Sequence, residues 1–306
     1  MKKRLLDCNT SDLQQLTKRM KLESIVASEG RVVVSEIIGL LQPVLVHISN
    51  AELASAFGAD ILLLNMFDVY NPVFNGIPKV EKQEIIRKIK SLTGRLIGIN
   101  LEPVDLNAET IGEITSISSG RLATVDSAKK AIDMGADMLV LTGNPGTGVT
   151  NKAIVSSLNS INEAVGNQVI LVAGKMHAAG SLREAGENII AKKDICEFSK
   201  AGADIILLPA PGTVPGITLE YIKELVTYTH SLDKLTITAI GTSQEGADSS
   251  TIKHIALMCK MTGTDLHHIG DNGFPGIAIP ENIMDYSIAI KGKKHTYTRM
   301  ARSITR

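Results

Sequence analysis

One pattern of apolar and polar positions recurs along the chain. Gly, Ala and Asp precede an apolar run and a break at residues 58–65, 135–142 and 202–209, and a weaker copy with Thr for Ala lies at 263–270. Glycine is favourable at the left-handed position just past a helix end. An apolar run of four or five residues suits a strand buried on both faces, as parallel strands are. Each copy therefore predicts a helix end followed by a buried parallel strand.

Further apolar runs lie before and between these copies, at residues 32–36, 96–100, 169–173 and 235–240. The sum is eight strands, each followed by a plausible helix, which predicts a single (β/α)8 TIM barrel of the α/β class. A doubly wound open sheet of similar length is the alternative. The first turn has no Rossmann-type glycine fingerprint, which favours the barrel.

The barrel leaves a segment at each end. We expect residues 1–30 to form an N-terminal helical extension, capped by Thr10 or Ser11, that covers the bottom of the barrel or a subunit contact. The barrel itself is expected over 31–292. After Asp285 the chain has six Lys or Arg and no acid, which predicts a solvated basic C-terminal tail over 293–306.

Composition narrows the classes of partner. The chain has 306 residues and equal numbers of basic and acidic side chains, 32 of each, so no overall field favours nucleic acid or an anionic membrane. Aromatic residues make up 3% and Trp is absent, which argues against base-stacking platforms. No run approaches the ~20 apolar residues of a membrane span. We therefore expect a small-molecule substrate, and neither nucleic acid nor membrane as a partner.

The cysteines are scattered and odd in number, at Cys8, Cys196 and Cys259, which fits a reducing cytoplasm better than a disulfide framework. The basic start of the chain has no apolar segment after it, unlike a signal peptide. We expect a cytoplasmic protein that forms a homo-oligomer.

In a TIM barrel the chemistry lies at the carboxyl ends of the strands. Polar residues appear there abruptly after the apolar runs: Glu36, Asn65, Asp68, Asn100, Glu102, Thr142, Asn144, Lys175, His177, Thr242, Glu245 and Asp271. The predicted catalytic residues are Lys175, His177, Glu36, Asn65, Asn100 and Glu102. Any one of them can equally be a hydrogen-bonding anchor for a loop. Lys175 can form a Schiff base if desolvation lowers its pKa, or serve as counter-charge to a phosphate or carboxylate.

Strand alternation orders these positions. The seventh residue after each repeat glycine should form one layer, and the residue two before it should share its face. These two sets are Asn65, Thr142, Pro209 and Gly270, and Leu63, Val140, Leu207 and His268. His268 is thus expected to point into the barrel and His267 away from it. A core histidine with satisfied hydrogen bonds is the alternative for His268.

Two loop regions have the composition of anion sites. The loops after the seventh and eighth strands occupy the usual phosphate position of barrels, and the predicted phosphate-binding residues are Gly241, Thr242, Ser243, Gly246, Gly270, Asp271 and Gly273. A second anion loop is predicted at Asn144, Gly146, Thr147 and Gly148, where a tight turn is the alternative. Asp68 and Glu102 are the predicted ligands of a hydrated Mg²⁺, unless Lys or Arg pairs with them.

Over most of its length the chain resembles an uncharacterised bacterial TIM-barrel family often labelled phosphoenolpyruvate phosphonomutase-like or haloacid dehalogenase-like. Residues 6–12, 28–32, 49–52 with 58–60, and 143–148 carry the resemblance. The phosphonomutase label implies a barrel that uses Mg²⁺ and carboxylates on 2-oxo acids or enolates. Residues 174–177 lack the cysteine of the related lyase motif, and residues 7–10 have Asn9 where the dehalogenase motif has its second Asp.

These observations together predict a lyase, aldolase or mutase that acts on a small phosphorylated or 2-oxo acid metabolite. Two other classes remain open. One is a non-catalytic barrel that binds a sugar phosphate for regulation, and the other is a hydrolase of phosphate esters.

Overall fold

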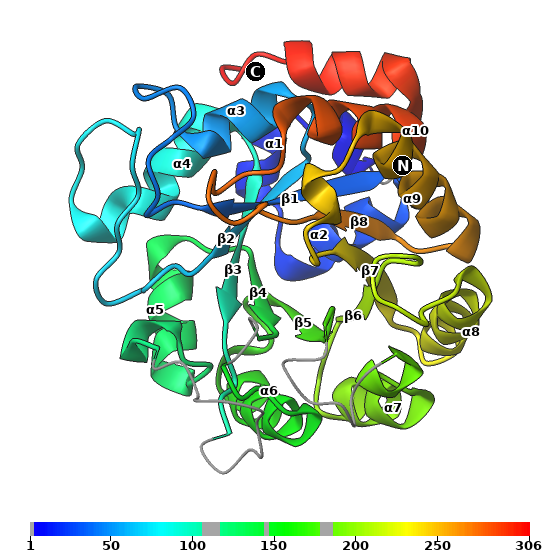
Figure 1. Ribbon diagram of the computed structural model, residues 1–306. Coiled ribbons are helices and arrows are strands. Elements are labelled where there is room, and N and C mark those ends of the chain that lie inside the picture. The colour runs from blue at the N-terminus through cyan, green and yellow to red at the C-terminus, as the bar shows by residue number, and fades with distance from the viewer. Residues whose placement is uncertain (1–2, 106–116, 144–146, 178–185) are drawn as a thin grey trace.

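The computed structural model describes residues 3–105, 117–143, 147–177 and 186–306. Within these ranges eight parallel strands close into a barrel in chain order, with β8 paired to β1 (Figure 1). The strands are β1 (Val32–Ile38), β2 (Ile61–Asn65), β3 (Leu96–Leu101), β4 (Met138–Leu141), β5 (Ile170–Gly174), β6 (Ile205–Pro209), β7 (Leu235–Ile240) and β8 (Leu266–Ile269). The predicted TIM barrel is confirmed, and each repeat copy contains an even-numbered strand.

An outer ring of helices surrounds the strands (Figure 1). The ring consists of α3 (Asn50–Ala56), α4 (Ile85–Thr93), α5 (Val125–Met134), α6 (Asn151–Val165), α7 (Lys192–Lys200), α8 (Leu219–His230), α9 (Ser249–Thr262) and α10 (Pro280–Ala301). The extension contains η1 (Leu5–Asp7), α1 (Thr10–Gln15) and α2 (Lys18–Val26), and shorter 3₁₀ turns are η2 (Lys82–Glu84), η3 (Ser119–Arg121), η5 (Gly186–Ile189) and η6 (Gln244–Gly246). Thr124, Thr150 and Thr218 cap α5, α6 and α8 through side-chain oxygens that accept backbone N–H bonds.

Alternate strand residues form two separate apolar clusters. Val34, Leu63, Val140 and Leu207 belong to the cluster inside the barrel, whereas the neighbouring strand residues pack outward against the helices. His268 lies inside, against Glu36. His267 points outward, where its Nε2 lies 3.0 Å from the Gly30 carbonyl oxygen. The predicted alternation is therefore confirmed.

The Asp of each repeat ties two strands together at the bottom of the barrel, the end where the strands begin. Each one accepts, through Oδ2, the N–H of a residue at the start of the preceding strand, at 2.8–2.9 Å. The pairs are Asp60 with Val33, Asp137 with Ile97, Asp204 with Leu171, and Asp265 with Thr236. We call these four aspartates the aspartate ring. The recurring Gly-Ala-Asp thus fastens neighbouring strands in addition to turning the chain.

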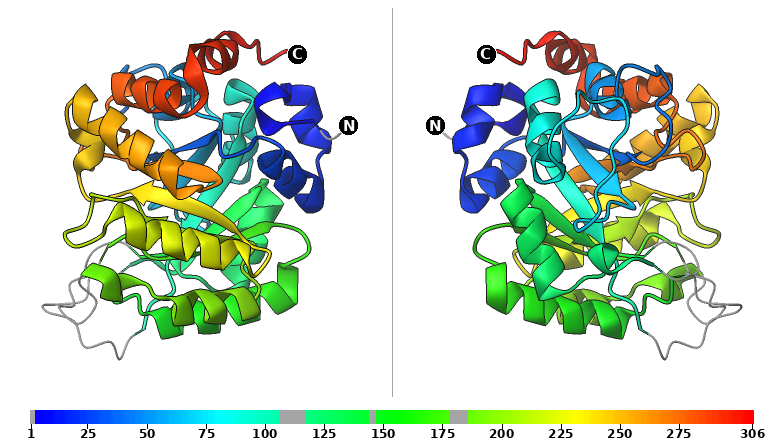
Figure 2. Two further views of the ribbon diagram at one scale, coloured as in Figure 1. Left: turned by 90° about the vertical axis from the view of Figure 1, so that its right-hand side faces the viewer. Right: turned by 90° about the vertical axis from the view of Figure 1, so that its left-hand side faces the viewer.

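The extension closes this bottom end through charge and apolar contact. On α2, Lys18 lies 2.7 Å from Asp204 and Lys21 lies 2.6 Å from Asp137. Leu5, Leu13 and Ile25 join the apolar cluster inside the barrel. Figure 2 shows the extension, in blue, packed against one end of the barrel. The extension thus lies at the bottom of the barrel, one of the two positions that the sequence left open for it.

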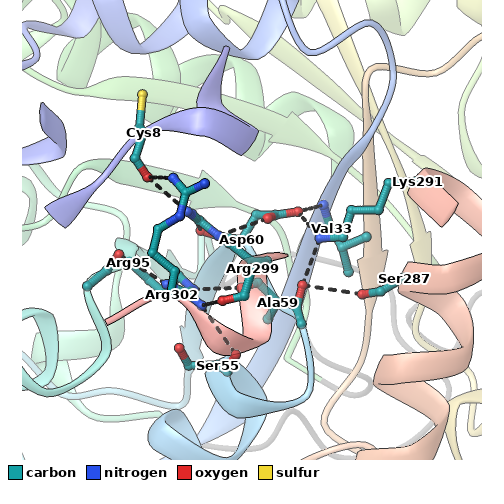
Figure 3. Close-up of polar contacts among 12 residues, drawn as sticks. Cys8, Val33, Ser55, Ala59, Asp60, Arg95, Ser287, Lys291, Arg299 and Arg302 are labelled. Carbon is teal, nitrogen blue, oxygen red and sulfur yellow. Dashed lines mark hydrogen bonds and ion pairs between the residues drawn. The ribbon is translucent and has the colours of Figure 1, made fainter. Parts of the chain in front are cut away.

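The predicted solvated tail is wrong for residues up to 301, because α10 continues to Ala301 and carries buried groups. Arg299 is 1% exposed, and its Nε lies 3.0 Å from Asp60 Oδ1, while Lys291 Nζ lies 2.6 Å from Asp60 Oδ2 (Figure 3). Arg95 also enters this cluster and donates to the carbonyl oxygens of Ala59 and Arg299. A run of basic residues looks solvated in sequence, but a buried carboxylate provides the partner that lets these cations leave water.

Candidate functional site

A cavity of about 190 Å³ lies at the carboxyl ends of the strands, and we call it the mouth cavity. Residues at or after the ends of seven strands line it; among the described residues, β6 contributes none. The lining consists of Glu36, Asn65, Asn100, Thr142, Gly143, Met176, His177, Gly241, Ser243, Glu245, Gly270, Asp271 and Gly273. A larger hollow of about 880 Å³ lies at the opposite end, between α2 and the segment before β7. Its partly buried acid, Asp204, is already paired with Lys18, so the mouth cavity is the better candidate for chemistry.

A buried carboxyl–imidazole pair forms the floor of the mouth cavity. Glu36 comes from β1 and His268 from the adjacent β8, and His268 Nε2 lies 3.0 Å from Glu36 Oε2. Burial raises the pKa of Glu36; His268 opposes this, and the nearby Asp271 and Glu245 add to it. Within the described part of the chain, His268 Nδ1 has no hydrogen-bond partner. The alternative of a fully satisfied core histidine therefore does not hold for His268.

An amide chain fixes the orientation of groups on the β2 and β3 side. Asn65 Nδ2 donates to Asp271 Oδ2 at 3.0 Å, so Asn65 Oδ1 faces the other way and accepts from Asn100 Nδ2 at 3.0 Å. Asn100 Oδ1 is consequently left buried, with no hydrogen-bond partner in the described ranges. Met66, directly after Asn65, has a φ of 55°, a left-handed conformation that is unfavourable for a residue with a side chain.

The loop after β7 brings a second buried carboxyl group to the mouth cavity. Glu245 lies in η6 and is 5% exposed, and its Oε2 has no hydrogen-bond partner among the residues described. Burial raises its pKa, and the charge of Asp271 raises it further. Asn282 of α10 holds the loop by donating to the Glu245 carbonyl oxygen at 2.9 Å. Glu245 is one of the polar residues predicted at the strand ends, but no catalytic role was predicted for it.

The loops predicted to bind phosphate lie at the cavity, but most of their donors are occupied. The N–H groups of Gly246, Gly270 and Gly273 donate to Ser243 O, Ile240 O and Asp271 Oδ1, at 3.2, 2.9 and 2.8 Å. The Thr242 hydroxyl donates to Thr213 O at 2.7 Å, and neither Thr242 nor Gly246 lines the cavity. Gly241, Ser243, Gly270, Asp271 and Gly273 do line it. Phosphate binding by this set stays a prediction.

At the end of β5 the structure separates the two residues that were predicted to act together. His177 lines the cavity together with Met176, whereas Lys175 is 2% exposed and does not belong to the lining. Burial and the charge of Lys175 lower the pKa of His177 to about 4, so its imidazole is neutral at pH 7. Lys175 is thus buried beside the cavity, where its charge acts on His177, and its catalytic role stays a prediction.

The predicted magnesium ligands are engaged with protein groups. Glu102 is 1% exposed and forms an ion pair with Arg121, whose Nε lies 3.1 Å from Glu102 Oε1. Asp68 Oδ1 accepts the N–H groups of Tyr70 and Asn71 at 2.8 and 2.9 Å. The described residues contain no group of three or more His, Cys, Asp or Glu side chains that could hold a metal ion. These two residues thus do not fit a magnesium site, and the pairing of Glu102 with Arg is confirmed.

The second predicted anion loop is described only in part. Asn144 and Gly146 lie outside the described residues. Thr147 is buried, and Gly148 has a φ of 69°, with its carbonyl oxygen accepting from Asp105 N at 3.0 Å. These contacts do not decide between an anion loop and a tight turn.

Sequence reasoning did not assign catalytic or binding roles to five residues of the mouth cavity and its floor: Thr142, Gly143, Met176, Glu245 and His268. For His268 and Thr142 the signal was present, because strand alternation placed both toward the inside. For Glu245 and Met176 it was not, since loop conformation decides where their side chains point.

The closed eight-stranded barrel and the polar cavity at its carboxyl face place the protein in the TIM-barrel class. The chain belongs to the family described as "Domain of unknown function (DUF7916)", whose model matches residues 6–306. The family description carries neither the phosphonomutase nor the dehalogenase label. The described part of the chain has no helix long and apolar enough to cross a membrane.

Two solved structures are similar to this chain, and the one with the higher TM-score supports the fold. A Schiff-base-forming fructose-1,6-bisphosphate aldolase has a TM-score of 0.53 at 13% identity, covering 88% of this chain and 98% of that chain. A thiamine phosphate pyrophosphorylase from Pyrococcus furiosus has a TM-score of 0.49 at 13% identity, covering 87% and 98%. No curated protein sequence matches the chain. At this identity the likeness shows the fold alone.

Proposed function

We propose that this protein is an enzyme of lyase, aldolase or mutase type that transfers protons on a small carbonyl metabolite in the mouth cavity. One observation carries the proposal: Asn100 Oδ1, Thr142 Oγ1, His177 Nδ1 and Glu245 Oε2 are buried around the cavity without hydrogen-bond partners in the described ranges. Each such atom costs about 1–3 kcal/mol. A bound molecule with hydroxyl and carbonyl groups supplies the missing partners.

The buried carboxyl groups have the properties of an acid–base pair. In an aldol cleavage, the Glu36–His268 pair accepts the proton of a substrate hydroxyl, and that carbon becomes a carbonyl as the adjacent C–C bond breaks. The electron pair of that bond passes to the carbon next to the substrate carbonyl, which then takes a proton from Glu245. A raised pKa favours the protonated form of Glu245 that this step requires. The neutral His177 accepts a hydrogen bond and orients the substrate.

Lys175 can take part in the same chemistry in one of two ways. The sequence gives it two roles, a Schiff base with the substrate carbonyl or a counter-charge for a carboxylate or phosphate. Its absence from the cavity lining favours the counter-charge. A 2-oxo acid, as the phosphonomutase resemblance implies, would place its carboxylate on this side. Because Asp68 and Glu102 are engaged elsewhere, no step of the proposal passes through a metal.

Deuterium incorporation tests the proposal directly. The protein is incubated in D₂O with dihydroxyacetone, dihydroxyacetone phosphate or pyruvate, and loss of the α-proton signal is followed by NMR. We expect exchange with at least one compound and none with Glu245→Gln, because Glu245 is the group that passes a proton to and from the α-carbon. Glu81→Gln, an exposed carboxyl at a distance from the cavity lining, is the control and should exchange normally.

The alternatives give different results. Saturable binding without exchange or product would favour a regulatory binding barrel, and release of inorganic phosphate would favour a hydrolase. Borohydride trapping followed by mass spectrometry tests the Schiff base. A substrate adduct on Lys175 that is absent in Lys175→Met would show that the enzyme uses covalent catalysis and not acid–base catalysis alone.

A further inference from the structure

One wall of the mouth cavity is acidic. It is formed by Glu36 at β1, Glu245 after β7 and Asp271 after β8, all of which line the cavity. The groups are close enough that the charges of Asp271 and Glu245 raise the pKa of Glu36. His268 is the basic group that contacts this wall, and it is already paired with Glu36. A phosphate placed here would meet like charges in a poorly solvated site, which costs free energy.

The same wall has few donors for an anion. Asp271 Oδ1 and Oδ2 are held by Gly273 N and Asn65 Nδ2, and the N–H of Gly270 donates to Ile240 O. Phosphate sites in barrels depend on backbone N–H groups that point at the ligand. In this protein the N–H groups of Gly246, Gly270 and Gly273 bond within the protein and do not point at a ligand.

The atoms that do lack partners are mainly acceptors. Asn100 Oδ1 can only accept, Thr142 Oγ1 can accept or donate, and Glu245 Oε2 accepts whenever the carboxyl is ionised. Asn100, Thr142 and Glu245 are 4%, 3% and 5% exposed, so bulk water reaches none of them freely. A ligand that satisfies them must bring several O–H donors on one side.

The size of the cavity limits the ligand. Its volume of about 190 Å³ is below the ~300–1,000 Å³ of pockets that hold drug-sized molecules. A compound of a few carbon atoms with a hydroxyl on most of them matches both the volume and the acceptor-rich lining.

We propose that the substrate presents hydroxyl groups, not a phosphate, to the wall formed by Glu36, Glu245, Asp271 and Asn100, and is thus a small unphosphorylated polyhydroxy carbonyl compound. The inference rests on the proposed function and narrows its substrate class. It departs from the sequence prediction of phosphate at this wall.

Calorimetric titration with matched pairs of compounds tests this inference. The probes are glyceraldehyde, dihydroxyacetone and erythrose, each with and without its terminal phosphate, and pyruvate as a compound without hydroxyl groups. We expect the unphosphorylated member of each pair to bind at least tenfold more tightly. Tighter binding of the phosphate esters, or of pyruvate, would overturn the inference.

Two variants test whether the acidic wall causes the preference for unphosphorylated compounds. Glu245→Gln removes one charge from the wall with little change of shape, so the preference against phosphate should shrink several-fold. Glu81→Gln should leave the preference unchanged. An unchanged preference in Glu245→Gln would show that the acidic wall is not its cause.

The two proposals fail in different ways. If phosphate esters bind and exchange their α-protons in D₂O, the proposed function stands and the hydroxyl wall is wrong. If no compound exchanges although unphosphorylated ones bind, the substrate class stands as a ligand class and the catalytic proposal is wrong.

Discussion

At the bottom of the barrel every carboxylate of the aspartate ring meets a backbone N–H and a cationic or imidazole partner, whereas at the mouth three carboxyl groups line one cavity and, among the described residues, only Glu36 pairs with an imidazole. Asp60 shows the first arrangement: burial alone would raise its pKa, but Lys291 and Arg299 hold it below the usual value. Glu245 shows the second, since burial and Asp271 both raise its pKa. An acidic side chain thus stabilises the bottom of the barrel, whereas at the mouth burial disfavours the charged form of the acidic side chain.

This difference indicates that the carboxylates at the bottom of the barrel serve folding, whereas the polar groups at the mouth can serve binding. Satisfied charges at the bottom hold the strands in register, and unsatisfied polar atoms at the mouth remain available for a ligand. The comparison can be tested by making the same chemical change, carboxylate to amide or amine to apolar group, at both ends.

The largest expected effect on stability is at Asp60. Asp60→Asn leaves Lys291 and Arg299 buried without their counter-charge, so the free energy of unfolding should fall by about 3–5 kcal/mol in urea denaturation. The double variant Asp60→Asn with Lys291→Met should recover part of this loss. A double variant no more stable than the single one would mean that charge pairing is not what Asp60 contributes.

At the mouth the corresponding change should affect turnover. Glu36→Gln removes a proton acceptor beside His268, and the rate of C–C cleavage should fall by about 10²–10⁴-fold, the usual contribution of an acid–base group. The circular dichroism spectrum and melting temperature should remain close to those of the parent protein. Retained cleavage in this variant would exclude Glu36 from the chemistry.

Removal of charge at Glu245 should increase stability, the opposite sign to Asp60. A carboxyl with a raised folded-state pKa is most favourable to folding below its unfolded pKa, and that contribution is lost as pH rises through the folded pKa. Glu245→Gln should therefore be more stable than the parent by about 0.5–2 kcal/mol at pH 7–8. The advantage should vanish near pH 4.5, and an advantage independent of pH would contradict this cause.

The smallest expected effect concerns His230, which lies 2.9 Å from Asp265 of the ring. The hydrogen bond to Asp265 raises the pKa of His230, so the pair stabilises the fold below pH 6.5 and this contribution is lost as pH rises through the folded pKa. Because His230 is 40% exposed, solvent screening should keep the effect below about 1 kcal/mol. His230→Gln should remove this pH dependence, which chemical denaturation between pH 6 and pH 8 can measure.

The sequence revealed the bottom of the barrel more completely than the mouth. The Gly-Ala-Asp repeat and the alternation of apolar residues predicted the strands and the inward direction of His268, because strand geometry has a fixed period. The cations that pair with Asp60 escaped prediction. Lys291 and Arg299 lie 231 and 239 residues away in the chain, and no local pattern links them to it.

The mouth residues depend on loops, for which sequence has no comparable period. Glu36, Asn65 and Asn100 could be predicted at the rim because they lie in the last residues of their strands, and His177 because it follows β5 closely. Met176 lines the cavity and Lys175 does not, and the strand order did not indicate this; Gly174 before them has a φ of 156° and lies against the Leu207 carbonyl oxygen, where a Cβ would be 2.0 Å away. Glu102 and Asp68 were predicted as metal ligands because a sequence does not show that Arg121 and two backbone N–H groups bind them first.

The distance along the chain between Asp60 and its partners has a consequence for biosynthesis. At about 5–20 residues per second, the ribosome adds the intervening 231 residues in roughly 10–50 seconds. During that time the nascent chain contains Asp60, Asp137 and Asp204 but neither Lys291 nor Arg299 to compensate the first of them. Early segments can form helices and pair neighbouring strands, but β1 and β2 cannot be fastened by Asp60 at low cost until α10 has emerged. Closure of the barrel is therefore expected only after α10 has emerged, and growing chains should remain sensitive to proteolysis until α10 is complete.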